Sequence, residues 1–212
     1  MHGVWIMRVP LLYLIATGQP AAPLNTLEAV EAAISGGVGM VQMREKGSTQ
    51  DELMALGREL RLLTRRLGVP LVVNDDPIMA ARLDADGVHV GQDDLPVAEV
   101  RRVFSGLVGL STHTAEQVAD GVAAGADLLG FGPLFSTETK DAGAPVGVDS
   151  LAKARTVAPA MTLIGIGGIS LTCVGSVIQA GADGVAICSE LMMSEDPEAT
   201  ARAFIREMNA AR

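Results

Sequence analysis

The sequence is short of aromatic residues, and this shortage bears on the fold. Phe, Trp and Tyr together make up 3% of the 212 residues, whereas hydrophobic residues make up 49% and glycine occurs 24 times. A core of small aliphatic side chains and glycine is not typical of all-β sandwiches and favours a compact α/β fold. A chain of this length can form one full core, so we predict a single domain over residues 1–212.

Positive charge is also scarce. The formal net charge is -9, and the isoelectric point is about 4.8. A negative field repels nucleic-acid backbones and anionic lipid surfaces, so we expect neither nucleic acid nor membrane as a partner. We expect small-molecule substrates instead, and any anionic one must meet positive side chains that are gathered locally.

Cysteines are few, and long hydrophobic runs are absent. Cys173 and Cys188 fit reduced thiols better than a disulfide framework, and without a recognisable cleavable leader we expect a cytoplasmic protein. Arg8 and Pro10 interrupt the apolar start of the chain, and the run over residues 11–16 is too short to span a bilayer. We therefore interpret this run as the first strand.

Short apolar runs alternate with longer segments of helical periodicity along the whole chain. This is the pattern of βα units around a parallel sheet. The runs cover residues 11–16, 39–44, 70–74, 87–90, 107–111, 127–132, 162–167 and 184–188. Eight such units predict a (β/α)8 TIM barrel in the α/β class.

Local signals mark the ends of several predicted helices. The expected N-terminal signals are Asn25 with Glu28, Ser48 ahead of Asp51 and Glu52, and Asp196 with Pro197. The segments AAGADLLG (123–130) and QAGADGVAI (179–187) resemble each other, and LDADGVHV (83–90) is a weaker echo. We expect glycine to adopt a left-handed conformation at these helix ends.

The run QMREK ends the second predicted strand with polar groups. Side chains just past the carboxyl ends of barrel strands converge on one face. Gln42, Arg44 and Lys46 alternate, so they share one side of the strand. If they face the interior, they form a cluster of donors with two positive charges. The alternative is a solvated strand end with Glu45 as a local partner.

Acidic pairs follow the third and fourth predicted strands. These positions hold Asn74, Asp75 and Asp76, then Gln92, Asp93 and Asp94. Carboxylates at neighbouring strand ends can share one hard cation, and sparse oxygen ligands suit Mg²⁺ better than Ca²⁺ or Zn²⁺. Each pair is equally compatible with one helix N-cap and one solvated acid.

Hydroxyl groups and one histidine follow the fifth and sixth strands. Ser111 lies near His113, but no orienting acid is identifiable, so hydroxyl donation to a substrate is favoured over nucleophilic attack. His113 either acts in catalysis or belongs to the cap of a helix that begins near Thr114. Thr137 lies with Thr139 and Lys140 in the irregular stretch 132–147, which suits phosphate oxygens unless it is a solvated flap.

The last two strands end in a pattern that favours phosphate binding. Gly167 and Gly168 allow close backbone approach ahead of a helix expected to begin at Ser170. Cys188 and Ser189 precede another short helix, and we interpret Cys188 as offering its amide rather than a reactive thiol. The loops after strands seven and eight are the usual phosphate site of such barrels.

Together the motifs QMREK, NDD, HVGQDD, STHT, TETK, GIGGI and GVAICS resemble those of the thiamine-phosphate synthase family, over nearly the whole chain. The resemblance implies a Mg²⁺-dependent transferase of thiamine biosynthesis. Such an enzyme joins hydroxymethylpyrimidine diphosphate to hydroxyethylthiazole phosphate and releases pyrophosphate. It also implies a dissociative mechanism, in which pyrophosphate leaves first and the thiazole nitrogen captures a pyrimidinyl cation.

The resemblance also assigns roles to residues. The whole run from Gln42 to Lys46, with Met43, Arg44 and Glu45, is implied to contact substrate. Residues implied on the diphosphate side are Gln42, Arg44, Lys46, Asn74, Ser111 and Lys140, of which Arg44, Lys46, Ser111 and Lys140 are implied in catalysis. Those implied around the thiazole phosphate are Thr137, Thr139, Gly168, Cys188 and Ser189. Asp75 and Asp94 are implied to hold Mg²⁺.

The sequence departs from the family pattern at two places, and it leaves two other functions open. LYLIATG lacks the Asp that commonly follows this first strand, and Met43 replaces a commoner Leu. One alternative is an isomerase similar to thiazole tautomerase, which also has a His after strand five. The other is a non-catalytic phosphate-binding barrel with a regulatory role. A homo-oligomer is compatible with the sequence, which does not specify an interface.

Overall fold

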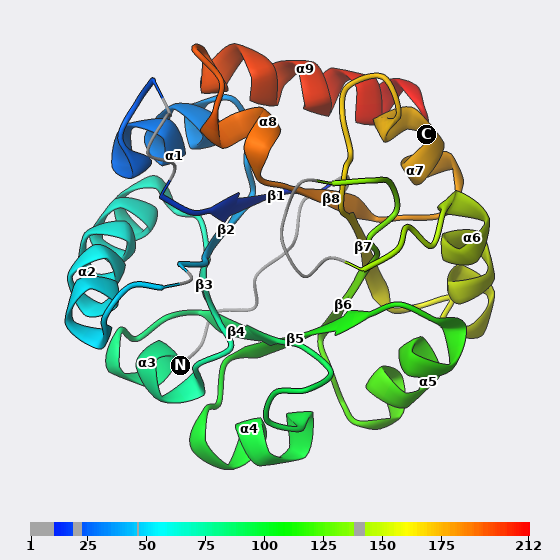
Figure 1. The fold of residues 1–212 in the computed structure, drawn as a ribbon, viewed down its shortest axis with the longest axis horizontal. Helices are drawn as coiled ribbons and strands as arrows, with labels where there is room; N and C mark the ends of the chain where they lie inside the picture. Colours follow the sequence, from blue (N-terminus) through cyan, green and yellow to red (C-terminus); the bar gives the residue numbers. More distant parts are fainter. Residues whose placement is uncertain (1–10, 19–22, 46, 138–142) are drawn as a thin grey trace.

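A computed structural model describes residues 11–18, 23–45, 47–137 and 143–212. Its strands pair in parallel and in chain order, and β8 pairs with β1 to close the barrel. Figure 1 shows the strands as a central ring with the helices around it. The predicted (β/α)8 fold is confirmed.

Each strand overlaps one of the predicted apolar runs. The strands are β1 (Leu11–Ala16), β2 (Met40–Met43), β3 (Leu71–Asn74), β4 (Gly87–Val90), β5 (Leu107–Thr112), β6 (Leu128–Phe131), β7 (Thr162–Ile166) and β8 (Gly184–Ile187). The helices of the described residues are α1 (Thr26–Ser35), α2 (Gln50–Leu67), α3 (Pro77–Arg82), α4 (Val97–Val103), α5 (Ala115–Ala123), α6 (Val148–Val157), α7 (Val174–Gln179), α8 (Ser189–Met192) and α9 (Pro197–Ala210). Within the described residues, no helix combines the length and the apolarity that crossing a membrane requires.

Both faces of the strands are buried, which explains why the runs are apolar throughout. In β1, Tyr13 and Ile15 belong to a core inside the barrel, together with Ile164 of β7. Their neighbours Leu12 and Leu14 belong to the larger core between the strands and the helices. Alternation along each strand thus decides which side chains can reach the interior.

Side-chain caps begin several of the helices, with one correction to the prediction. Asn25 caps α1 in a capping box with Glu28, and Asp196 caps α9, as expected. The N-cap of α2 is Thr49, so the prediction of Ser48 was wrong. The Glu52 carboxylate accepts the Thr49 N–H at 2.8 Å, and this reciprocal bond fixes the first turn.

The repeated segments form a repeated structure at the amino-terminal ends of the strands. Gly125 and Gly181 have φ angles of 80° and 102°, as predicted, and Asp84 takes the equivalent position in the third segment with φ of 49°. Two residues after each of these positions lies an aspartate. Each aspartate pairs with an arginine from the helix before the one that ends in its segment. The pairs are Arg61–Asp86, Arg101–Asp127 and Arg155–Asp183.

Candidate functional site

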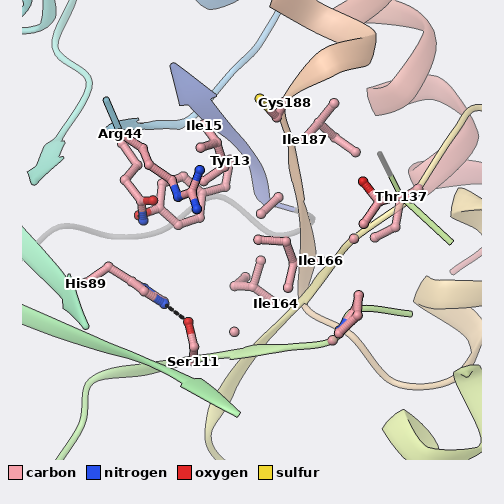
Figure 2. Close-up of a pocket in the computed structure, with 18 of the residues that line it drawn as sticks. Tyr13, Ile15, Arg44, His89, Ser111, Thr137, Ile164, Ile166, Ile187 and Cys188 are labelled. Carbon is pink, nitrogen blue, oxygen red and sulfur yellow. Dashed lines mark hydrogen bonds between the residues drawn. The ribbon is translucent and has the colours of Figure 1, made fainter. Parts of the chain in front are cut away.

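A cavity of about 500 Å³ opens at the carboxyl ends of the strands. Its apolar floor includes Tyr13, Ile15, Leu128, Ile164 and Ile166. The polar residues around it are Gln42, Arg44, Asn74, His89, Ser111, Thr112, His113, Ser136, Thr137, Ser189 and Glu190. In Figure 2, Arg44 and His89 lie on one side of the cavity, and Thr137 and Cys188 lie on the other.

The structure brings together most of the predicted site residues. Those that line the cavity are Gln42, Arg44, Asn74, Ser111, His113, Thr137, Gly168, Cys188 and Ser189. Lys46, Thr139 and Lys140 lie outside the described residues. Met43, Glu45, Asp75 and Asp94 are not part of the cavity lining.

The end of β2 faces the interior, as predicted from its alternation. Gln42 is 3% exposed, and its Nε2 donates to the Tyr13 hydroxyl oxygen at 2.9 Å. Burial raises the pKa of Tyr13, so the phenol stays neutral. Arg44, two residues after Gln42, reaches the cavity and supplies positive charge there (Figure 2).

Met43 and Glu45 point elsewhere. The Met43 side chain belongs to the core between the strands and the helices, close to Gly57 of α2. Glu45 accepts a hydrogen bond from the Gly18 backbone N–H. A direct substrate contact by the Met43 side chain therefore does not fit this orientation.

The four acidic residues after β3 and β4 include one helix cap, Asp76, and two acids that bond to backbone near the end of β4, Asp75 and Asp94. Asp76 caps α3, because its carboxylate accepts the Met79 N–H at 2.8 Å. The Asp75 N–H donates to the His89 carbonyl at 2.8 Å, and Asp94 accepts the Gly91 N–H at 2.7 Å. Asp75 and Asp94 thus each form a hydrogen bond at the end of β4.

These two acids offer the oxygen donors that a magnesium ion takes, although they form no larger cluster. Within the described residues, no group of three or more His, Cys, Asp or Glu side chains is placed to hold a metal. Mg²⁺ needs only one or two carboxylates, because it keeps waters and takes phosphate oxygens. The hard oxygen donors of Asp75 and Asp94 therefore suit Mg²⁺ better than softer metals.

A buried histidine, His89, was not singled out from the sequence. Its side chain lies inside the barrel and is 8% exposed. Burial lowers the pKa of His89 to about 4, an effect that the Asp94 charge partly opposes. The only sequence signal was a polar residue at an inward position of β4, between two valines that face the helices.

Ser111 pairs with His89 and not with His113. His89 Nε2 lies 3.0 Å from Ser111 Oγ (Figure 2). His113 Nδ1 instead lies 2.5 Å from the Gly132 carbonyl oxygen, to which it donates. No carboxylate among the described residues orients His89, so the pair lacks the third member of a catalytic triad. Without a complete triad, nucleophilic attack by Ser111 is not favoured, and hydroxyl donation to a substrate stays the prediction.

The role of His113 at a helix cap is also clear. Thr114 is the N-cap of α5, and the His113 N–H donates to Gln117 Oε1 at 2.7 Å. His113 therefore belongs to the cap region, which was one of the two alternatives, although its ring still borders the cavity.

The loop after β7 brings backbone close to the cavity. Gly167 and Gly168 have φ angles of 92° and 64°, and a side chain on Gly168 would collide with the backbone near Phe135. The helix expected at Ser170 begins only at Val174, so that boundary was wrong. The Ser170 carbonyl instead accepts the Cys173 N–H at 3.2 Å and the Val174 N–H at 3.0 Å, so a turn precedes α7.

Cys188 and Ser189 begin α8 at the same side of the cavity. Cys188 is the N-cap residue, and Ser189 is the first helical residue. Burial raises the pKa of the Cys188 thiol, although the Arg44 charge opposes this. A thiol held neutral agrees with the prediction that Cys188 contributes its backbone rather than a reactive sulfur.

Comparison with known proteins adds a family to this geometry. The family model described as "Thiamine monophosphate synthase" matches residues 12–191. Thiamine-phosphate synthase of Natronomonas pharaonis is 42% identical over 196 residues, which cover 90% of this chain and 91% of that protein. The enzyme of the same name from Chloroflexus aurantiacus is 44% identical over 193 residues, with 90% and 89% covered.

A solved structure agrees with these sequence comparisons. Thiamine phosphate pyrophosphorylase from Pyrococcus furiosus superposes with a TM-score of 0.85 at 29% identity. The superposition covers 95% of this chain and 96% of that chain. The similarity therefore extends over the barrel as a whole, including the strands that carry the cavity.

Proposed function

Because the chain belongs to the thiamine monophosphate synthase family, we propose that it is a thiamine-phosphate synthase. This transferase joins hydroxymethylpyrimidine diphosphate to hydroxyethylthiazole phosphate and releases thiamine phosphate and pyrophosphate. The observation that carries the proposal is the family match over residues 12–191, a range that contains all the residues lining the cavity.

The side of the cavity formed by β2, β3 and β5 would take the pyrimidine diphosphate. Arg44 offers a planar guanidinium that suits two phosphate oxygens at once. Asn74 and Ser111 add uncharged donors, and Gln42 lies deeper against Tyr13. Lys46 and Lys140 would complete the positive charge on this side.

Magnesium would bind beside this diphosphate, held by Asp75 and Asp94. When bound, it would neutralise charge on the departing diphosphate. Both acids form hydrogen bonds at the end of β4, next to Asn74 on the neighbouring strand end. Their role is thus to place positive charge near the diphosphate without contributing a group that reacts.

The opposite side of the cavity would take the thiazole phosphate. Gly168, Cys188 and Ser189 present backbone at the ends of β7 and β8, and Thr137 adds a hydroxyl from the loop after β6. Thr139 would act in the same loop. Neutral donors suit this phosphate, because it is retained in the product and does not develop new charge.

The chemistry that follows needs no protein nucleophile. The bond from the pyrimidine methylene carbon to the diphosphate oxygen breaks, and the thiazole nitrogen then forms a bond to the same carbon. Ile15, Leu128 and Ile164 on the cavity floor would keep water from that carbon between the two steps. Ser111 lacks an oriented base, which agrees with a role in binding.

Pyrophosphate release tests the proposal directly. Wild-type protein with both substrates should release pyrophosphate only with Mg²⁺, and EDTA should abolish the release until Mg²⁺ is restored. Asp75→Asn should raise the Mg²⁺ concentration needed for half-maximal rate by roughly tenfold or more. Asp76→Asn is the matched control, because Asn caps a helix as well as Asp does.

Other outcomes would contradict this function. Isomerisation of a thiazole phosphate that is abolished in His113→Ala would identify a tautomerase. Binding of phosphate compounds without turnover would identify a non-catalytic barrel.

We further propose that the enzyme works in the cytoplasm. Cys173 and Cys188 are both free thiols, as expected in a reducing compartment. Fractionation of cells that express the protein would place it, and recovery of the protein outside the cytoplasm would overturn this assignment.

A further inference from the structure

His89 contacts Ser111, which the proposed function places at the diphosphate. The proposed function gives His89 itself no role. Its Nε2 lies 3.0 Å from Ser111 Oγ, and Ser111 borders the cavity. The Ser111 backbone is held separately, because its carbonyl accepts a hydrogen bond from Gln92 Nε2 at 2.6 Å. The Ser111 hydroxyl can therefore turn about its Cβ–Oγ bond while it contacts both His89 and the cavity.

Which atom donates in the His89–Ser111 bond depends on the position of the imidazole hydrogen. Nδ1 of His89 is buried and has no hydrogen-bond partner among the described residues. A methyl carbon built on Gly109 would lie far inside contact distance of Nδ1, so Nδ1 faces the Cα hydrogen of Gly109. The neighbouring Gly130 leaves room for the opposite edge of the ring.

This contact favours a lone pair on Nδ1. A Cα–H group can donate weakly to a lone pair, but it offers nothing to an N–H. A hydrogen on Nδ1 would be a buried donor without an acceptor, which is rare in folded proteins. Nε2 then carries the hydrogen and donates to Ser111 Oγ. A doubly protonated ring would donate to Ser111 in the same way.

We propose that His89 is a positioning residue that donates from Nε2 to Ser111 Oγ and so directs the Ser111 hydrogen into the cavity. There the hydroxyl hydrogen is free to donate, which favours an oxygen acceptor such as a diphosphate oxygen. This inference rests on the proposed function for the identity of the ligand. The hydrogen-bond direction itself is a property of the protein alone.

The first test reads the hydrogen position without substrate. The sequence contains three histidines, so nitrogen NMR of the ring atoms can be assigned by loss of one set of signals in His89→Gln. We expect the hydrogen on Nε2 and a lone pair on Nδ1. A hydrogen on Nδ1 alone would overturn the proposal, whatever the enzyme activity.

The second test measures how His89 acts on the ligand. His89→Leu should weaken Mg²⁺-pyrophosphate binding by roughly tenfold and raise KM for the pyrimidine diphosphate similarly, with little change in KM for the thiazole phosphate. His89→Gln should restore most of this loss, because its amide nitrogen can take the place of Nε2. In Ser111→Ala, the further change His89→Leu should have almost no effect on either constant.

The results separate this inference from the proposed function. If the wild type binds pyrophosphate but makes no thiamine phosphate, the proposed function fails, while the pyrophosphate-binding measurements on the variants still test His89. If the wild type is active and His89→Leu keeps its KM values, or if the two substitutions act additively, the positioning role is wrong.

Discussion

At the amino-terminal ends of the strands, each repeated acid has both an arginine and a backbone N–H as partners, whereas at the carboxyl ends the polar side chains surround a cavity. Asp86 illustrates the first rim. Arg61 binds it with both terminal nitrogens, at 2.5 and 3.2 Å, and the Leu71 N–H donates to it at 2.8 Å. The side chains of Asp86 and Arg61 are only 13% and 11% exposed.

The same arrangement recurs twice around this rim. Asp127 accepts the Val108 N–H at 2.7 Å, and Asp183 accepts the Leu163 N–H at 2.8 Å. In each case the acid precedes an even-numbered strand. It accepts a backbone N–H from the neighbouring odd-numbered strand and pairs with an arginine on a helix, so it links the two elements. In all three pairs the charges bind one another and a backbone N–H of the barrel.

The carboxyl rim is organised differently. Arg44 lies at the cavity, and His89 contacts Ser111 at the cavity wall. A barrel can keep such groups at one rim because the other rim and the two cores hold the strands together. Substitutions at the two rims should therefore change different quantities, namely stability at one and rate at the other.

The largest effect should come from Asp86→Ala at the amino rim. It leaves the Arg61 guanidinium without its buried counterion and the Leu71 N–H without an acceptor. The free energy of unfolding should therefore fall by about 3–5 kcal/mol. Urea denaturation would measure this, while kcat/KM at low temperature should stay within about twofold of the wild type.

An exposed ion pair supplies the control for this substitution. Glu99→Ala removes the partner of Arg102, whose side chain is 73% exposed, and should cost at most about 0.5 kcal/mol. Equal losses in Asp86→Ala and Glu99→Ala would show that burial of the pair does not matter.

At the opposite rim, Arg44→Leu should lower kcat/KM by roughly 10²–10³-fold, because one preorganised donor to developing charge is lost. The free energy of unfolding should change by less than about 1 kcal/mol, since a cation at a cavity edge does not hold the core together. Steady-state kinetics and thermal unfolding of the same sample would check both. A parallel fall in rate and melting temperature would remove the distinction between the rims.

Gly109→Ala should affect both quantities, because Gly109 lies where the core meets the cavity floor. The new methyl group would push against His89, at a cost of about 1–3 kcal/mol in stability, and would disturb the bond to Ser111. Thermal unfolding and the KM for the pyrimidine diphosphate should therefore change together.

The matched control is Gly175→Ala in α7. A methyl group there meets only Ala211, at an ordinary contact distance of 3.6 Å. It should stabilise the helix by about 0.5–1 kcal/mol and leave the kinetics unchanged. A Gly109→Ala protein that behaved like this control would show that the His89 ring can move freely.

Much of the fold could be predicted because its determinants are local. Each strand coincides with an apolar run, since both of its faces are buried, and the inward direction of Gln42 follows from alternation alone. The capping box of Asn25 and Glu28 likewise involves groups three residues apart. Where local rules competed, prediction failed: Thr49 rather than Ser48 caps α2.

The partners of the site residues could not be predicted in this way. Ser111 lies two residues from His113 in the chain, yet it pairs with His89, which is 22 residues away. Met43 carries a motif position but faces the helices. The segment 83–90, the least similar of the three repeated segments, has the same structure as the others. Asp84 adopts there the left-handed backbone that glycine adopts in the other two.

The sequence by itself determined where strands and helices lie and which strand residues can face inward, because periodicity and capping act over a few residues. Only the tertiary structure decided which inward groups meet. Pairing of β4 with β5 and closure of the ring by β8 and β1 set the distances between side chains far apart in the chain. Those distances follow from the register of the strands, which no local pattern encodes.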